Sequence, residues 1–312
     1  MATETSSPAV LVEGLRKSYR TKVAVDDVSL AVEPGEIFGI LGPNGAGKTT
    51  TVESIAGLRV GDAGRVRVHG LDPWTERDAL VRVLGIQLQE SALQPKITVR
   101  EALELWSAFY DDPVPWQGLA GQLGLSDHLD RRFGLLSGGQ QQRLSIALAL
   151  VGRPQVAILD ELSTGLDPRA RREVWQIVRD LRATGVTILL VTHSMEEAQQ
   201  LCDRIAIIDR GRVRALGTPE ELVRSGSAAT ITTFETATPP DLETLRALDG
   251  VVDARLEHGQ VVVEGAEDVV LAVLGSLAAQ QVAPHRLRVV AGSLDTAYLD
   301  LTDDTSAKAD AS

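Results

Sequence analysis

The chain has 312 residues, with 31 Lys plus Arg against 43 Asp plus Glu. Its formal charge of −12 argues against a nucleic-acid-binding surface and against direct adhesion to anionic lipid, and its length leads us to expect two domains. Because no apolar run approaches the roughly 18 residues of a membrane span, and the start of the chain lacks a signal-peptide pattern, we expect a cytosolic protein.

The first elements lead into a phosphate-binding loop. Residues 10–34 read as short strands with polar turns, and residues 66–70 would continue the same antiparallel sheet. The apolar run 37–41 precedes GPNGAGKTT, a G-x-x-x-x-G-K-[ST] loop that opens a helix expected at residues 48–58. Lys48 would reach the β and γ phosphates, and Thr49 would offer its hydroxyl to Mg²⁺. For this motif alone, a Gly-rich surface turn is the alternative.

A helical region follows, and a second candidate anion site stands at its end. Residues 99–110 are strongly helical, the breaker run DDPVPW interrupts them, and a second helix is expected near residues 118–123. Leu136-Ser137-Gly138-Gly139-Gln140 stands directly before the helix-forming segment QQRLSIALAL. Ser137 and its glycines therefore lie at a helix start, where backbone N–H groups can bind an anion.

Two apolar strands end in residues able to do chemistry. Residues 156–159 form a run typical of a doubly covered parallel strand, and Asp160 and Glu161 follow it. Asp160 is positioned to hold Mg²⁺, and Glu161 to polarise the water that attacks the γ-phosphorus. Residues 163–167 leave as a loop, and the strand 186–193 ends in His193, which could contact the γ-phosphate. Taken singly, the carboxylates could be a solvated pair and His193 a satisfied strand-end residue.

The next elements suggest a mainly parallel core sheet. A helix at residues 168–184 crosses to the His193 strand, and a helix at 194–203 leads into a strand at 204–209. Such alternation of strands and helices is typical of parallel sheets. The single cysteine, Cys202, excludes an internal disulfide and a multi-cysteine metal site, and its setting suggests a core thiol.

This ensemble resembles the nucleotide-binding subunit of an ATP-binding cassette (ABC) transporter over about residues 9–225. By position, the resemblance implies that Tyr19 stacks on adenine, that Gln89 is the Q-loop glutamine and that His193 is the switch histidine. Asp160 and Glu161 match the Walker B pair, and residues 163–167 match the D-loop. Leu162 stands where the family usually has proline. Gln87 is the alternative to Gln89, and Tyr19 could be a half-buried edge aromatic.

The resemblance also assigns the site residues as groups. The nucleotide contacts come from Tyr19, from the Walker A loop and from the LSGGQ signature: Gly42, Pro43, Asn44, Gly45, Ala46, Gly47, Lys48, Thr49, Thr50, Ser137, Gly138, Gly139 and Gln140. The catalytic residues would be Glu161, His193, Lys48 and Gln89, and the Mg²⁺ ligands Thr49, Gln89 and Asp160. The cofactors it implies are ATP and Mg²⁺.

The sequence beyond a linker at residues 224–227 reads as a separate module. Its order is strand, helix, two strands, helix and strand, which predicts a small ferredoxin-like α+β fold: strands at 229–234, 251–256, 261–264 and 285–290, helices at 240–248 and 266–280. Residues 293–302 resemble the closing helix of ATPase subunits from drug-exporting ABC systems of the daunorubicin-resistance type. We therefore expect an ATPase domain at 9–225, an accessory module at 226–302 and a disordered tail at 303–312.

The implied fold is α/β: a P-loop NTPase core of the ABC ATPase type with an antiparallel β subdomain and a helical subdomain. In this family two subunits sandwich two ATP molecules, so a second copy and a separate membrane permease are the expected partners, with no nucleic acid. The chain would lie at the cytoplasmic face of the membrane, peripheral through the permease. Export of a small hydrophobic molecule or an antibiotic is the leading reading; an importer ATPase, or a soluble ABC protein of DNA repair or translation, is the alternative.

Overall fold

The computed structural model describes residues 7–88, 93–225, 230–257, 259–266, 269–290, 294–295 and 297–298. The chain divides into two compact units, Met1–Pro219 and Glu220–Ser312. The boundary predicted after residue 225 lies at the end of helix α8, Pro219–Ser225.

The centre of the first unit is a six-stranded sheet in the order β5-β6-β7-β3-β8-β9. Its first five strands pair in parallel, and β9 closes the edge antiparallel to β8. Every residue of β3, β6 and β7 is buried, which explains their continuous apolar runs. The strand bounds are β3 Ile37–Leu41, β5 Leu84–Gln87, β6 Val156–Asp160, β7 Thr187–Thr192, β8 Arg204–Asp209 and β9 Arg212–Gly217.

A second sheet confirms the predicted antiparallel subdomain. Strands β1 (Val10–Tyr19), β2 (Lys22–Val32) and β4 (Ala63–Val68) pair antiparallel in the order β2-β1-β4. Side chains of this sheet, such as Val12, share one buried cluster with Phe38 and Ile40 of the central sheet. The two sheets therefore form one hydrophobic core.

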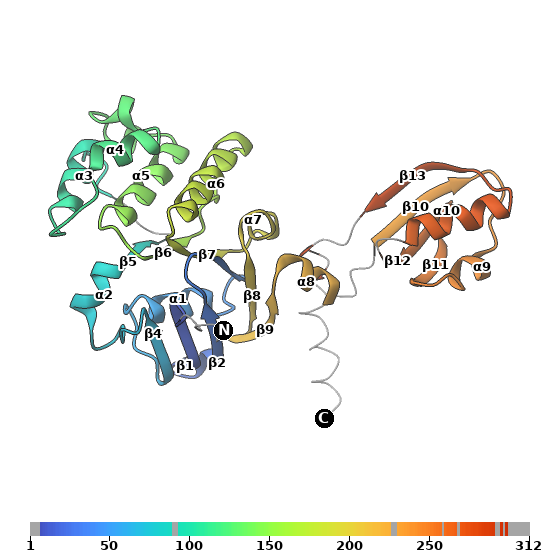
Figure 1. Cartoon of the computed structure of the whole chain (residues 1–312), viewed down its shortest axis with the longest axis horizontal. Coiled ribbons are helices and arrows are strands. Elements are labelled where there is room, and N and C mark those ends of the chain that lie inside the picture. Colours follow the sequence, from blue (N-terminus) through green and yellow to red (C-terminus); the bar gives the residue numbers. More distant parts are fainter. Residues whose placement is uncertain are drawn as a thin grey trace, which may run out of the picture. The chain divides into compact units, whose positions relative to one another are not determined.

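Helices α3, α4 and α5 gather away from the β1-β2-β4 sheet (Figure 1). The helix bounds are α1 Lys48–Ile55, α2 Arg77–Val83, α3 Val99–Ser107, α4 Trp116–Gln122, α5 Gly138–Leu150, α6 Pro168–Ala183 and α7 Met195–Leu201, with 3-10 turns at Ser126–His128 and Phe133–Leu135. Helix α1 ends three residues before the predicted Leu58 because Gly57 takes a φ of 71°, and a Cβ there would lie 2.4 Å from the Pro73 carbonyl oxygen. No helix among the residues described is both long and apolar enough to cross a membrane.

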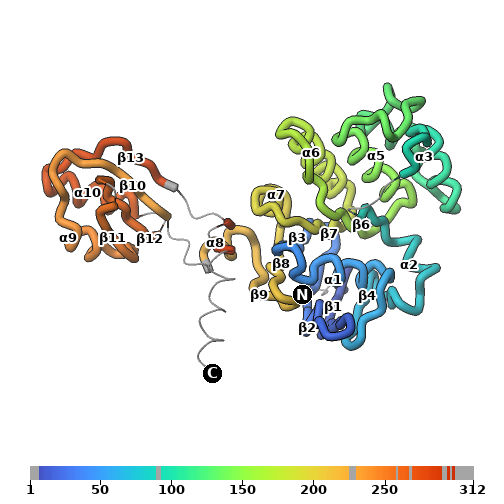
Figure 2. The backbone as a smooth tube through the Cα atoms, turned by 180° about the vertical axis from the view of Figure 1, so that it is seen from behind, coloured from blue at the N-terminus to red at the C-terminus, as the bar shows by residue number. Residues whose placement is uncertain are grey.

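The second unit has the predicted βαββαβ order (Figure 2). After helix α8, its elements are β10 Thr230–Thr236, α9 Leu242–Arg246, β11 Val251–Glu257, β12 Gln260–Gly265, α10 Val269–Ala279 and β13 Pro284–Val290. All neighbouring strands pair antiparallel in the order β11-β12-β10-β13. Phe234, Val263, Leu245 and Val273 form a core in which residues of both helices pack against one face of the sheet.

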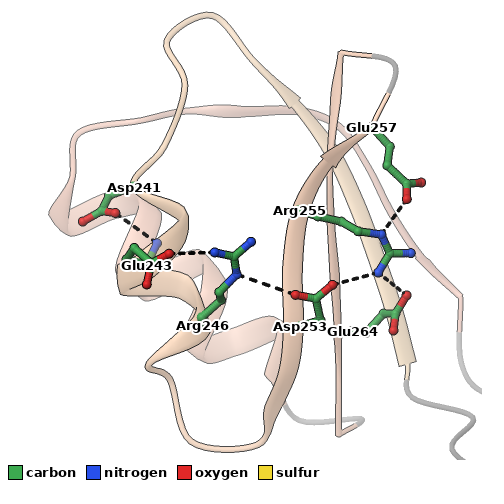
Figure 3. A network of polar contacts seen from close by, with 7 residues as sticks. All are labelled: Asp241, Glu243, Arg246, Asp253, Arg255, Glu257 and Glu264. Atoms are coloured by element: carbon green, nitrogen blue, oxygen red, sulfur yellow. Dashed lines mark hydrogen bonds and ion pairs between the residues drawn. The ribbon is translucent and has the colours of Figure 1, made fainter.

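Arginines and carboxylates form a network on strands β11 and β12 and helix α9 (Figure 3). One guanidinium, that of Arg255, contacts Asp253 at 3.1 Å, Glu264 at 2.6 Å and Glu257 at 2.5 Å. Arg246 continues the chain of contacts, with Asp253 at 3.6 Å. Of the predicted closing helix at 293–302, residues 294–295 and 297–298 are described and helical; the tail at 303–312 lies outside the described residues.

Candidate active site

The phosphate loop joins the buried strand β3 to helix α1, as its motif predicts. Gly45 and Gly47 have φ values of 81° and 105°, which side chains rarely adopt. Gly42 is restricted by space, since a Cβ there would lie 2.1 Å from the backbone oxygen of Ile208 in β8. The glycines therefore allow the loop to turn and to pack closely against the backbone of the neighbouring strand.

Lys48 begins helix α1 and is almost fully buried. Its Nζ donates to the carbonyl oxygens of Gly42 at 2.7 Å and Pro43 at 3.1 Å. Burial lowers the pKa of the ammonium group, and the nearby carboxylates Glu161 and Asp160 oppose this shift. The Lys48 side chain thus bends back toward the phosphate loop, and its ammonium group interacts electrostatically with both carboxylates.

A pocket of about 440 Å³ brings together seven of the fourteen predicted nucleotide contacts, with Asp160 and Glu161 beside them. It is lined by Tyr19, Lys22, Ala24, Asn44, Gly45, Gly47, Lys48, Thr49, Thr50, Asp160 and Glu161. The sequence reasoning missed Lys22 and Ala24. Lys22 pairs with Tyr19 across the two-residue turn at 20–21, so the tight spacing of that hairpin was the signal that could have found it.

Tyr19 lines this pocket and is 37% exposed. The guanidinium of Arg59 lies 5.4 Å from the ring centroid and the ammonium of Lys17 lies 5.9 Å from it. Both cations are within the range of a cation–π contact. Tyr19 is therefore a partly solvated ring held by cations rather than a core aromatic.

Asp160 ends strand β6 and is 3% exposed. Its backbone N–H donates to Oε1 of Gln87 at 3.1 Å, and Nε2 of Gln87 donates to the Leu88 carbonyl at 3.0 Å. Gln87 is buried in β5 and holds the strand end that carries Asp160. Gln89, the predicted Q-loop glutamine, lies outside the described residues.

Glu161 and His193 meet although 32 residues separate them. Strands β6 and β7 are neighbours, and the His193 Nδ1 lies 3.1 Å from Glu161 Oε1. The hydroxyl of Thr164 donates to Glu161 Oε2 at 3.2 Å. Glu161 also has a φ of 51°, the left-handed region, which turns the chain sharply out of the strand. Both carboxylate oxygens are thus oriented by neighbouring side chains.

The LSGGQ segment lines a different pocket. Ser137 caps helix α5: its hydroxyl accepts from Gln140 N–H at 3.4 Å, and Gln140 Oε1 accepts from Ser137 N–H at 2.9 Å. Ser137, Gly138 and Gly139 share this pocket of about 320 Å³ with residues of the loop and helix α6 that follow, but with none of those that line the Lys48 pocket. The predicted nucleotide residues therefore occupy two separate places on one chain.

Comparisons with known proteins agree with this arrangement. The family model for "ABC transporter" matches residues 25–164. The Nod factor export ATP-binding protein I of Ralstonia nicotianae is 42% identical over 224 residues, 70% of each chain. The linearmycin resistance ATP-binding protein LnrL of Bacillus subtilis is 33% identical over 304 residues, 94% of this chain and 98% of that protein.

Solved structures give the same answer for the fold. The chain cbiO1 from Clostridium perfringens, part of an ABC transporter complex, aligns with a TM-score of 0.64 at 26% identity, over 70% of this chain and 92% of that one. The dimeric bacterial cassette MJ0796 aligns at 0.62 and 26% identity, over 67% and 98%. With a phosphate loop, paired strand-end carboxylates and an LSGGQ helix start in the expected places, the chain belongs to the ATP-binding subunits of ABC transporters.

Proposed function

We propose that this ATPase drives the export of a small hydrophobic molecule or an antibiotic through a separate membrane permease. The observation that carries the proposal is the similarity to the linearmycin resistance protein, which extends over 94% of the chain and so includes the second unit. The relatives named for Nod factor export point the same way but match about 70% of the chain. These names favour export over the import alternative.

We assign the phosphate contacts to the loop and Lys48. The Lys48 ammonium donates to two carbonyl oxygens of its own loop, and a triphosphate in the same pocket would offer it negatively charged oxygens. Backbone N–H groups of residues 42–50 and the start of helix α1 would bind the remaining phosphate oxygens. Tyr19, at the pocket edge, is the proposed adenine platform.

We assign Mg²⁺ to Thr49 and Asp160, with Gln89 kept as a predicted third ligand. The donor set fits, because the buried carboxylate Asp160 and the exposed residue Thr49, which carries a hydroxyl, line the same pocket, and oxygen ligands suit this ion. When bound, the ion would neutralise charge on the β and γ phosphates.

We assign the activation of the attacking water to Glu161. His193 and Thr164 each bond to one oxygen of its carboxylate, so the group is held with little freedom. A fixed carboxylate can accept a hydrogen bond from water without first reorganising. His193 is half exposed, which leaves its ring able to reach the γ-phosphate.

We propose a sandwich of two copies as the working state. Lys48 and Ser137 line pockets with no residue in common, so a single chain offers two half-sites. Two copies arranged head to tail would complete two sites, each with the loop of one chain and Ser137 and Gly139 of the other. Hydrolysis removes the γ-phosphate contacts that favour closure, and opening would move the permease at the cytoplasmic face.

We propose that the second unit, which contains the predicted module at 226–302, serves as a packing or partner surface. All proposed catalytic residues precede it. It has its own hydrophobic core, and among its described residues there is no cluster of His, Cys, Asp and Glu that could hold a metal.

The experiment that tests export compares cells lacking this chain with cells carrying it. Loss of the chain should raise both the susceptibility to linearmycin or other hydrophobic antibiotics and the accumulation of a labelled compound. Wild-type chain should reverse both effects, and Lys48→Ala should reverse neither. Two results together would instead support import: unchanged accumulation of the labelled compound in cells that lack the chain, and a growth defect of those cells that one added nutrient relieves.

A further inference from the structure

A buried carboxylate ties together three segments beside the proposed catalytic pair. Glu197, the third residue of α7, is 1% exposed. Its Oε1 accepts a short hydrogen bond from the Ser163 hydroxyl and a second bond, of 3.1 Å, from the indole Nε1–H of Trp175 in helix α6. The same indole N–H also lies 3.2 Å from Ser163 Oγ. One oxygen atom therefore joins the loop after Glu161 to both helices.

The Glu197 carboxylate does not cap the start of its own helix, α7. Ser194 caps the helix by accepting from the Glu197 N–H at 3.2 Å. In a capping box the glutamate would bond back to the N–H of the capping serine. Here the Thr192 hydroxyl takes that N–H at 3.0 Å, so the Glu197 side chain points instead to Ser163 and Trp175.

The contact lies close in sequence to both members of the catalytic pair. Ser163 is two residues after Glu161, and Ser194 directly follows His193. Helices α6 and α7 are held together a second time, because Arg171 pairs with Glu196 at 3.1 Å and lies 5.3 Å from the Trp175 ring centroid. The loop after Glu161 and the end of the His193 strand are thus both connected to the packed pair of helices α6 and α7.

The cost of this arrangement argues for a role beyond packing. A buried carboxylate is expensive unless it is paired, and within the described part of the chain no Lys, Arg or His forms an ion pair with Glu197. Two neutral donors, the Ser163 hydroxyl and the Trp175 indole N–H, bind the carboxylate. Apolar side chains could fill the same space at a smaller cost in free energy, but they would not specify where the Ser163 loop lies.

We propose that Glu197 and Trp175 are positioning residues for hydrolysis: through Ser163 they hold the loop at residues 161–167 so that the Glu161 carboxylate stays beside His193. The inference rests on the proposed roles of Glu161 and His193. Ser163, Trp175 and Glu197 do not line the Lys48 pocket. Substituting any of them should therefore leave the affinity for ATP intact and slow the chemical step.

The test uses two mild substitutions and a matched control. Ser163→Ala removes the hydroxyl, and Trp175→Phe removes the indole N–H but keeps an aromatic ring. Trp74→Phe is the control, because Trp74 is a partly buried residue of the same unit that also donates its indole N–H, to the carbonyl of the buried Ser54 at 3.0 Å. We expect kcat to fall about tenfold or more in the first two variants with KM unchanged, and to stay unchanged in the control. Thermal unfolding is measured on all three.

A second pair of variants separates positioning from simple stability. Glu197→Gln keeps an oxygen that can accept both bonds, so it should restore most of the kcat lost in Glu197→Ala; if the alanine variant does not fold, Ser163→Ala and Trp175→Phe decide. Equal kcat values for Trp175→Phe and Trp74→Phe, or full activity of Ser163→Ala, would overturn the proposal. Retained hydrolysis in Lys48→Ala would instead overturn the proposed site itself.

Discussion

The nucleotide pocket of the first unit and the Arg255 network of the second both gather carboxylates, yet they use them differently. In the pocket, Asp160 is 3% exposed and lines the same space as Lys48 and the phosphate loop. In the network, Asp253, Glu257 and Glu264 are partly exposed and converge on one guanidinium. Water already solvates the second group, whereas protein groups must orient the first. An acidic cluster thus indicates chemistry when it faces a phosphate loop, and surface stabilisation when arginines bind it.

The largest effect should come from removing the cation of the pocket. We expect Lys48→Ala to lower ATP hydrolysis by about 100-fold or more, because the charge developing on the phosphates loses a buried ammonium partner. Phosphate release with Mg·ATP measures this. Arg255→Ala serves as the control, since it removes a cation of the second unit and should leave the rate unchanged. Undiminished hydrolysis in the lysine variant would break the contrast between the two regions.

A second effect should separate binding from chemistry within the pocket. Glu161→Gln keeps the shape of the side chain and its contacts with His193 and Thr164 but weakens the acceptor for water, so we expect hydrolysis to fall by about 100-fold or more while ATP binding persists. The closed state should then accumulate. Size-exclusion chromatography should show a dimer with Mg·ATP and a monomer without it. A variant that stays monomeric at high protein and ATP concentrations would contradict pairing between identical chains.

The smallest effect should arise in the Arg255 network. The hydrogen bond from Arg255 is the main cause that lowers the pKa of Asp253, so its carboxylate contributes stability above its ordinary pKa of 3.8, and this contribution is lost as the pH falls through the lowered value. Arg255→Ala should therefore lower the unfolding temperature of the second unit slightly at pH 7. The difference from wild type should shrink on acidification below about pH 4 and in high salt.

Calorimetry of the full chain at both pH values checks this prediction, with Arg246→Ala as the companion variant because Arg246 pairs more distantly with Asp253, at 3.6 Å. A difference that grows as the pH falls would mean that the network does not stabilise the charged carboxylate.

Much of the fold followed from local patterns. The phosphate loop, the helix start at Ser137 and the apolar strands β3, β6 and β7 were predicted because their glycines, cap and buried runs act over a few residues. The βαββαβ order of the second unit was predicted for the same reason. The predicted end of α1 was wrong by three residues: Gly57 takes a φ of 71°, and the space around it is set by a segment elsewhere in the chain, since a Cβ added there would lie 2.4 Å from the Pro73 carbonyl oxygen.

The sequence by itself determined which residues could do the chemistry and in what order they stand: a lysine after a glycine loop, two carboxylates after one strand and a histidine after another. Only the tertiary structure decided which of them meet. The pairing of β6 with β7 brings Glu161 to His193, the packing of α6 and α7 buries Glu197 against Ser163, and Ser137 comes to line a pocket apart from that of Lys48. Motifs specify local backbone and side-chain chemistry, whereas strand order and helix packing set the contacts between distant residues.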